Sequence, residues 1–140
     1  TNIYTAETHF VLRPNFPLYQ PFPAHCTGTG RVFLSHMSEA AQKWVYENSV
    51  GAIGMSQEEF LALLRKARKD GYARDDQAFN AGLRCVAAPI YLGGGKLLFA
   101  LSISAPTARM DDAAYENARK LVLKYAELIS QEIQSIEFRF

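Results

Sequence analysis

The chain has 140 residues, of which 49% are apolar and 21% are charged, and its formal net charge is +1. This length and composition suit one globular domain with its own core, and the small net charge disfavours a domain that binds DNA or RNA on its own surface. No apolar run approaches the roughly 18 residues of a membrane helix, and no signal peptide is visible. Neither Cys26 nor Cys85 belongs to a C-x-x-C pair. We therefore expect a cytoplasmic protein with no membrane segment, disulfide framework or zinc ribbon.

The first part of the chain contains one strand-like segment and one irregular loop. Residues Asn2 to Thr8 alternate as in a strand, and His9 to Leu12 either extend it or turn away. Between Arg13 and Pro23 the prolines exclude regular backbone hydrogen bonding, although many side chains are large and apolar: Phe16, Leu18, Tyr19 and Phe22. Such a loop usually covers a core, and less often its aromatic side chains line a ligand cavity.

Two glycines stand where a helix is expected to begin after this loop. The run HCTGTG at 25–30 leads into apolar residues, and Thr27 or Thr29 is the expected N-cap of a short helix that ends near Met37. Glycines at a helix N-terminus let a ligand approach the unpaired backbone N–H groups, whose dipoles favour negative charge. The run therefore predicts either a binding site for a carboxylate or an ordinary capped helix.

Two further helices are expected before the sheet. The first runs from Ser38 to about Asn48 and has Ala41, Trp44 and Val45 on its inner face; the run GAIG at 51–54 follows it as a break. The second opens with a capping box formed by Ser56 and Glu59, and Gly71 ends it. The basic residues in its last turns complement the helix C-terminus, which favours a solvated surface over a partner site.

Three segments are expected to form the sheet. Tyr72 to Arg74 is a short strand, and the acidic bend DDQ at 75–77 is explained better by turn chemistry than by metal binding. Leu83 to Leu92 and Lys96 to Ser104 form an antiparallel hairpin around three glycines. Asp111 or Asp112 caps a long final helix with an apolar face made of Ala114, Ala118, Leu121, Val122, Tyr125, Leu128, Ile129, Ile133 and Ile136. This order predicts the α+β class: an antiparallel sheet with helices packed on it and a long C-terminal helix.

Three polar or polarisable side chains interrupt the apolar hairpin: Cys85, Ser102 and Ser104. Strand alternation places the two serines on the same face. A turn of two or four residues adds Cys85 to that face, whereas a three-residue turn places it on the other. The first arrangement gives the floor of a polar pocket, and the second gives a plain hairpin whose serines bond to backbone or water.

Catalysis and metal binding are the alternatives to a binding role. A cysteine-dependent enzyme would need His25 within hydrogen-bond reach of Cys85, together with a third group that orients the histidine. Cys85 lies in the middle of a strand, where a buried cysteine usually serves as a small hydrophobic residue. His25, Cys26 and His36 lack the spacing of a metal site. We therefore expect no enzyme, cofactor or metal, and retain a small enzyme using Cys85 and His25 as the alternative.

Four segments, in this order, resemble the effector-binding (C-terminal) domain of IclR-type bacterial transcriptional regulators. They are HCTGTGR at 25–31, GYA at 71–73 with the aspartates that follow, GLRCVAAPI at 82–90 and LSISAPT at 101–107. The similarity runs from about Ile3 to the last helix. It implies a GAF-like effector-binding domain over residues 1–140, in a protein that forms a homodimer or tetramer. It also implies that DNA is contacted only through an N-terminal winged helix-turn-helix domain, which is absent from this chain.

The resemblance also implies a ligand and its contacts. The ligand is a small organic acid, and the contacts fall on Gly28, Thr29, Asp75, Cys85, Ser102 and Ser104. This chain departs from the family at Gly28, commonly Ala, and at Arg31, commonly Lys; Gln77 and Ala78 replace residues that are usually acidic. In the resulting hypothesis the N–H groups near Gly28 bind the carboxylate and Asp75 accepts a hydrogen bond. Ligand binding then changes the subunit arrangement and, through it, the affinity for DNA.

Overall fold

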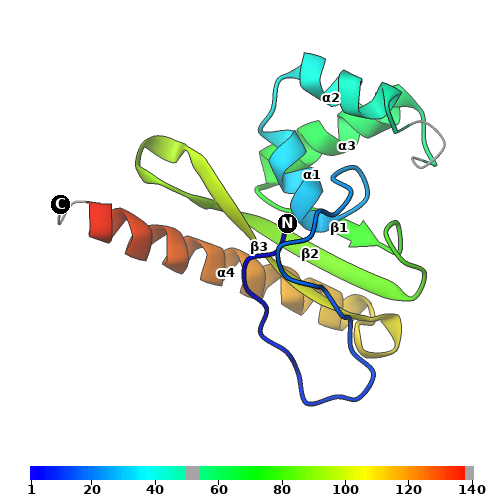
Figure 1. The fold of residues 1–140 in the computed structure, drawn as a ribbon, viewed down its shortest axis with the longest axis vertical. Coiled ribbons are helices and arrows are strands. Elements are labelled where there is room, and N and C mark those ends of the chain that lie inside the picture. Colours follow the sequence, from blue (N-terminus) through cyan, green and yellow to red (C-terminus); the bar gives the residue numbers. More distant parts are fainter. Residues whose placement is uncertain (50–53, 138–140) are drawn as a thin grey trace.

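The computed structural model describes residues 1–49 and 54–137. Among them, β1 (Ala73–Asp76), β2 (Leu83–Tyr91) and β3 (Leu97–Pro106) form one antiparallel sheet in the order β1-β2-β3. The long helix α4 (Asp112–Glu137) lies along one face of this sheet, and α1 (Gly28–Ser35), α2 (Glu39–Glu47) and α3 (Gln57–Asp70) lie on the other side (Figure 1). The α+β class predicted from the sequence is therefore confirmed. None of the described helices is both long and apolar enough to cross a membrane.

Alternate residues of β2 face the two helical layers. Val86, Ala88 and Ile90 pack with Ala118 and Val122 of α4 in the main core. Small residues along α4 let the helix lie close to the sheet, and its buried face consists of Tyr115, Ala118, Val122, Ala126 and Ser130. The face predicted from the sequence was therefore partly wrong, because several of its members are more than a third exposed: Leu121, Tyr125, Leu128, Ile129 and Ile136.

Side chains cap the helices of the smaller layer, and of the two N-caps predicted for α1, Thr27 is the one that forms. The Thr27 side chain accepts the N–H of Gly30, and Ser38 caps α2 in the same way. Ser56 forms the predicted capping box of α3, which ends at Gly71 with a left-handed φ of 78°. The predicted break at 51–54 falls almost wholly outside the described residues.

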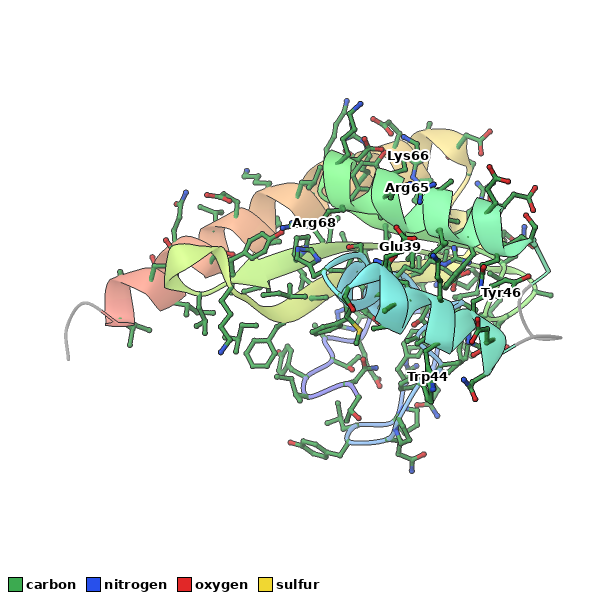
Figure 2. The ribbon with its side chains drawn as sticks, turned by 90° about the horizontal axis from the view of Figure 1, so that it is seen from above. Glu39, Trp44, Tyr46, Arg65, Lys66 and Arg68 are labelled. Carbon is green, nitrogen blue, oxygen red and sulfur yellow. The ribbon has the colours of Figure 1, made fainter. Side chains whose placement is uncertain are left out.

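The predicted inner face of α2 was wrong at Trp44, which is 64% exposed (Figure 2). Gln42 is buried instead, because its amide donates hydrogen bonds to the carbonyl oxygens of Leu34 (2.8 Å) and Met37 (3.2 Å). A polar side chain can hold the interior position because it satisfies two carbonyl groups there, one of them at the end of α1.

The strand predicted at Asn2 to Thr8 does not form. The first 23 residues contain one isolated bridge, from Asn2 to Leu18, in which the Tyr19 N–H donates to the Asn2 carbonyl oxygen (2.8 Å). Alternating apolar residues make a strand only where a neighbouring strand pairs with their backbone, and in the described part of the chain Leu18 is their one bridge partner. The segment is instead a wide loop outside the helices and strands (Figure 1).

The hairpin between β2 and β3 turns through three glycines. The Leu92 N–H donates to the Lys96 carbonyl oxygen (2.8 Å) across Gly93–Gly95, and Tyr91 pairs with Leu97. Odd-numbered residues therefore face odd-numbered residues next to the turn. This is the arrangement of a three-residue turn, which by itself would have placed Cys85 on the face opposite the serines.

A bulge then reverses the pairing. Between Ile90 and Tyr91 the register shifts by one residue, with Leu98 as the extra residue of β3, and from there inward odd residues pair with even ones. Cys85 consequently lies opposite Ser104. The polar face that the sequence left open is formed, but the bulge rather than the turn length produces it.

Candidate functional site

A row of polar side chains crosses all three strands on the face toward α1. Asp75 of β1 pairs with Cys85 of β2, and Cys85 pairs with Ser104 of β3; Ser102 ends the next row. Directly paired residues on neighbouring strands point to the same face. The three strands thus bring a carboxylate, a thiol and two hydroxyls together on one face of the sheet.

Gly28 lets the N-terminus of α1 approach this row. A Cβ atom at position 28 would lie 3.1 Å from the Cys85 Sγ and 3.4 Å from the Ala87 Cβ, so any side chain would press on the site. The Thr27 hydroxyl donates to the Pro23 carbonyl oxygen (2.8 Å) and accepts the N–H of Gly30 (3.2 Å), which fixes the start of the helix. The first-turn N–H of Thr29 has no partner among the described residues, as expected at a helix N-terminus.

The thiol of Cys85 is held in its neutral form. Burial raises the pKa of Cys85 and the Asp75 carboxylate raises it further, while hydrogen bonds with the Ser104 and Ser102 side chains and with the Gly28 N–H act in the opposite direction. A nucleophilic cysteine needs a lowered pKa and an adjacent base. His25 does not line the cavity that contains Cys85. The pair required by the alternative enzyme hypothesis is therefore not assembled.

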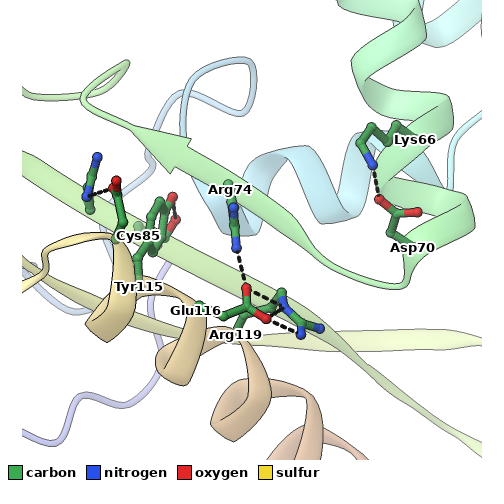
Figure 3. Close-up of polar contacts among 9 residues, drawn as sticks. Lys66, Asp70, Arg74, Cys85, Tyr115, Glu116 and Arg119 are labelled. Atoms are coloured by element: carbon green, nitrogen blue, oxygen red, sulfur yellow. Dashed lines mark hydrogen bonds and ion pairs between the residues drawn. The ribbon is translucent and has the colours of Figure 1, made fainter.

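Tyr115 of α4 supports Cys85 from the opposite side of the sheet. Its hydroxyl donates to the Cys85 carbonyl oxygen (2.8 Å), and the guanidinium carbons of Arg74 and Arg84 lie 4.7 Å and 5.1 Å from the centroid of its ring. Glu116 joins Arg74 to Arg119 beside it (Figure 3). Tyr115 was not predicted from the sequence as part of the site. A tyrosine early in an amphipathic helix can indicate such a role, because the hydroxyl of a buried tyrosine usually has a hydrogen-bond partner.

Asp75 belongs to β1 rather than to the predicted acidic bend. The residue is 2% exposed, and its Oδ1 accepts the backbone N–H groups of Ala78 (2.8 Å) and Phe79 (3.2 Å), so it also closes the turn after the strand. Burial raises the pKa of Asp75; the two N–H groups and the positive charge of Arg31 oppose that rise. Sequence reasoning was right about the turn chemistry but did not foresee that the side chain would be buried.

The predicted residues share one small cavity, which we call the inner chamber. Its volume is about 30 Å³, and it is lined by Asn2, Phe16, Phe22, Thr27, Gly28, Thr29, Asp75, Phe79, Leu83, Cys85, Ser102 and Ser104. All six residues singled out from the sequence are among them. The structure brings them together; that they bind an effector stays a prediction.

A second cavity of about 650 Å³, the outer groove, adjoins the inner chamber. The two share lining residues, including Phe16, Phe22, Ser102 and Ser104. The outer groove lies between residues 1–8 and the exposed edge of β3, and Phe33 of α1 also lines it. A guest in the inner chamber could therefore extend into the outer groove.

Three aromatic rings cover the inner chamber. Phe22 packs edge-on against Phe16 (5.7 Å between ring centroids) and against Phe79 (5.8 Å). The irregular loop thus supplies an aromatic lining, the rarer of the two roles that its composition allows. Tyr19 is not part of it: its side chain is 74% exposed and lines neither cavity. Phe79 was missed as a lining residue because only the Asp75 turn brings it there.

The arrangement is suited to holding a small polar group. Hydroxyl groups and a free N–H can donate hydrogen bonds, and the Asp75 carboxylate can accept them. In residues 1–49 and 54–137 no group of three or more His, Cys, Asp or Glu side chains is placed to hold a metal ion.

The comparison with protein families now identifies the class of this domain. The family model described as "Bacterial transcriptional regulator IclR C-terminal" matches residues 4–131. The chain belongs to this family, as its four motifs predicted.

Individual relatives agree with this assignment. The HTH-type transcriptional regulator XynR of Escherichia coli (strain K12) is 33% identical over 103 residues, which cover 70% of this chain and 41% of the relative. The crystal structure of the transcriptional regulator YaiJ has a TM-score of 0.84 at 25% identity and covers 94% of this chain and 77% of that one. The C-terminal domain of the E. coli regulator KdgR has a TM-score of 0.66 at 28% identity, over 79% of this chain and 71% of that one.

These relatives are transcriptional regulators and not enzymes, as the sequence predicted. The chain spans less than half the length of the curated relatives XynR and BhcR, 41% and 47% respectively. The comparison therefore concerns the C-terminal part of such regulators, the part for which a ligand-sensing role is general.

Proposed function

We propose that this domain senses a small organic acid, which it binds in the inner chamber. The observation that carries the proposal is the convergence of Gly28, Thr29, Asp75, Cys85, Ser102 and Ser104 on a single small cavity. A volume of about 30 Å³ holds a group of the size of a carboxylate rather than a whole ring. The N–H of Thr29 and the hydroxyls of Ser102 and Ser104 are the groups that would donate hydrogen bonds to it.

The remainder of the acid would lie in the outer groove. Phe16 and Phe22 line both cavities, so a chain or ring attached to the carboxyl group meets aromatic surface as it leaves the inner chamber. Apolar and aromatic side chains with a few converging polar groups are the usual composition of small-molecule sites. This supports a bulky or aromatic acid over a two-carbon acid.

In the whole protein the domain would act on DNA binding indirectly. We propose a homodimer or tetramer working in the cytoplasm, in which a winged helix-turn-helix domain contacts the operator. The small net charge of this chain, +1, supports a division of labour in which another domain binds DNA. The acid would change DNA affinity to the extent that it binds one subunit arrangement more tightly than another.

A thermal-shift screen tests the binding proposal. Acetate, lactate, benzoate and phenylacetate are added to the wild type and to Ser102→Ala, and the melting temperature is measured against acid concentration. A ligand that binds only the folded state stabilises it by RT ln(1 + [L]/Kd). We expect at least one acid to raise the melting temperature, and Ser102→Ala to weaken its Kd by about tenfold, the effect of losing one hydrogen bond to a charged group.

Ser135→Ala is the matched control, because that serine is exposed on α4 and bonds to the Glu132 carbonyl oxygen. The control variant should respond to the acids as the wild type does. The proposal is wrong if none of the four acids stabilises the wild type. Rapid alkylation of Cys85 by iodoacetamide at neutral pH would in addition favour the cysteine-enzyme alternative, since a buried thiol with a raised pKa should react slowly.

A further inference from the structure

The inner chamber poses a charge problem for the acid that it is proposed to bind. Asp75 lines it, and none of the described lining residues is Lys, Arg or His. Asp75 Oδ1 is already bonded to two backbone N–H groups, whereas Oδ2 has no donor among the described residues. Oδ2 is therefore the Asp75 oxygen available to a guest. A second carboxylate beside it would place two like charges together in a poorly solvated space.

The nearest cation does not resolve this conflict. Arg31 of α1 is buried, and its guanidinium donates to the carbonyl oxygens of His25 (3.0 Å) and Arg74 (2.7 Å) rather than to Asp75. It acts on Asp75 only as a nearby charge. Arg13 lines the outer groove, but it is paired with Glu7 (3.0 Å) and does not line the inner chamber.

The other ionisable groups around Asp75 make a negative charge there less favourable or do not change it. They come from every neighbouring element: Cys26 precedes α1, Asp76 follows on β1, Cys85 lies on β2, and Tyr115 projects from α4. Burial and the Asp75 carboxylate both raise the pKa of Cys26, and burial raises the pKa of Tyr115. Both groups are therefore neutral at physiological pH. Among the lining residues that the structure describes, the chamber therefore contains one carboxylate, neutral donors and no partner cation.

We propose that an organic acid enters the inner chamber together with one proton, which is shared between the guest carboxyl group and Asp75 Oδ2. The two carboxyl groups then form an O–H···O hydrogen bond in place of a repulsive contact. Asp75 thereby becomes a specificity residue, because it favours guests that can donate a hydrogen bond to its Oδ2, protonated acids among them. It also makes ligand binding depend on pH. This inference rests on the proposed function of the chamber.

Proton uptake has a measurable signature. When binding takes up one proton, Kd rises about tenfold per pH unit above the pKa of Asp75 in the free domain and becomes flat below it. Burial raises that pKa, so the change occurs closer to neutrality than for an exposed aspartate. Benzoate should therefore bind more weakly from about pH 6 to about pH 8. Benzamide, its neutral isostere, should show no such trend, because its NH₂ group donates to the ionised carboxylate.

Calorimetry with benzoate on the domain tests the inference, and acetate, lactate and phenylacetate are measured in the same way. Titrations in phosphate and in Tris, which differ in ionisation enthalpy, give the number of protons taken up; we expect about one in the wild type above the pKa of Asp75. Asp75→Asn keeps an oxygen for the two N–H groups and presents a permanent donor to the guest. It should bind with no proton uptake, and more tightly than the wild type at about pH 8.

Asp112→Asn is the control, because Asp112 is exposed and bonded to Arg84 (3.0 Å) rather than placed in the chamber. It should take up the proton as the wild type does. Binding with a Kd that does not change with pH and with no proton uptake would overturn this inference and leave the sensing function intact. If Arg13→Gln then abolished that binding, the carboxylate would be assigned to the outer groove. If none of the four acids binds to the wild type, the sensing function is wrong and this inference is wrong with it.

Discussion

The floor and the cover of the inner chamber are built in different ways. The floor consists of β1, β2, β3 and the start of α1, where Cys85, Asp75 and Gly28 are buried and the side chains of Asp75 and Cys85 are hydrogen-bonded. The cover consists of residues 1–23, where most side chains are exposed and the one bridge joins Asn2 to Leu18. Only a few side chains of this segment, Phe16 and Phe22 among them, reach the chamber.

This difference separates two tasks within one cavity. Groups that donate or accept hydrogen bonds to a ligand must be held in fixed positions, and regular buried elements provide this. The part of the cavity that contacts the rest of the ligand can vary without disturbing the core, because few backbone hydrogen bonds depend on it. We therefore expect changes in the floor to alter stability and binding together, and changes in the cover to alter selectivity alone.

The largest effect is expected where the cover joins the floor, at Gly30. A Cβ atom there would lie 2.4 Å from the Cα and carbonyl oxygen of Ala24, which are backbone atoms that cannot rotate away. Gly30→Ala should lower the free energy of unfolding by about 3 kcal/mol, at the upper end of single substitutions. Urea unfolding measures this change. Gly54→Ala is the matched control, since nothing lies within 4 Å of a Cβ at that position; equal stability of the two variants would show that the loop before α1 is free to move.

A smaller effect is expected for Phe22→Ala in the cover. The variant removes two edge-to-face contacts, each worth about 1 kcal/mol, but the ring is only partly buried and the fold does not depend on it. The Kd of phenylacetate should rise about fivefold, whereas that of acetate should hardly change. Isothermal calorimetry gives both values. Tyr19→Ala, which alters an exposed aromatic on the same loop, should leave both unchanged; parallel losses for the two acids in Phe22→Ala would mean that the cover also orders the floor.

The same contrast explains what could be predicted from the sequence. The helix caps at Thr27, Ser38 and Ser56 were predictable because capping depends on residues within one turn. Cys85, Ser102, Ser104 and the glycines at the start of α1 stood out in the local pattern, and the resemblance to a known family added Asp75 as a ligand contact. Alternation alone could place only the two serines on one face. The position of Cys85 could not be derived, because it depends on the bulge at Leu98 and nothing in the local pattern marks an extra residue there.

The cover was predicted least well, for a physical reason. Strand formation at Asn2 to Thr8 depends on a partner elsewhere in the fold, and an alternating pattern does not reveal whether one exists. Burial was also predicted wrongly at two positions outside the cover. The large apolar side chain of Trp44 is exposed, and the carboxylate of Asp75 is buried. Hydrogen bonds to the backbone decide the placement of the polar residues: Gln42 is buried because the Leu34 carbonyl oxygen accepts its amide, and Asp75 because the N–H groups of its own turn bond to it.

The smallest effect is expected at His36, a titratable residue between α1, α3 and β2 that lies outside the chamber. His36, which follows α1, contacts the Val32 carbonyl oxygen through Nδ1 (2.9 Å) and both Arg68 of α3 (2.9 Å) and Tyr91 of β2 (2.7 Å) through Nε2. Because a guanidinium can only donate, Nε2 must accept, and the imidazole is neutral with its proton on Nδ1. Burial lowers the pKa of His36, the bond to Val32 raises it, and the charge of Arg68 lowers it further.

This contact should make the domain less stable in mild acid. The unfolded chain protonates His36 near its ordinary pKa of about 6.5, before the folded domain does, so the free energy of unfolding falls from there down to the lowered pKa and is flat below it. Urea unfolding at about pH 7.5 and about pH 5.5 should show a smaller loss in His36→Gln than in the wild type. Burial also lowers the pKa of His25, so His25→Gln is the control, and it should keep the share of the loss that is due to His36. If the free energy of unfolding falls equally in the wild type and in His36→Gln, the contact with Arg68 does not prevent the imidazole from taking up a proton in the folded domain. This layer would then be no more rigid than the cover.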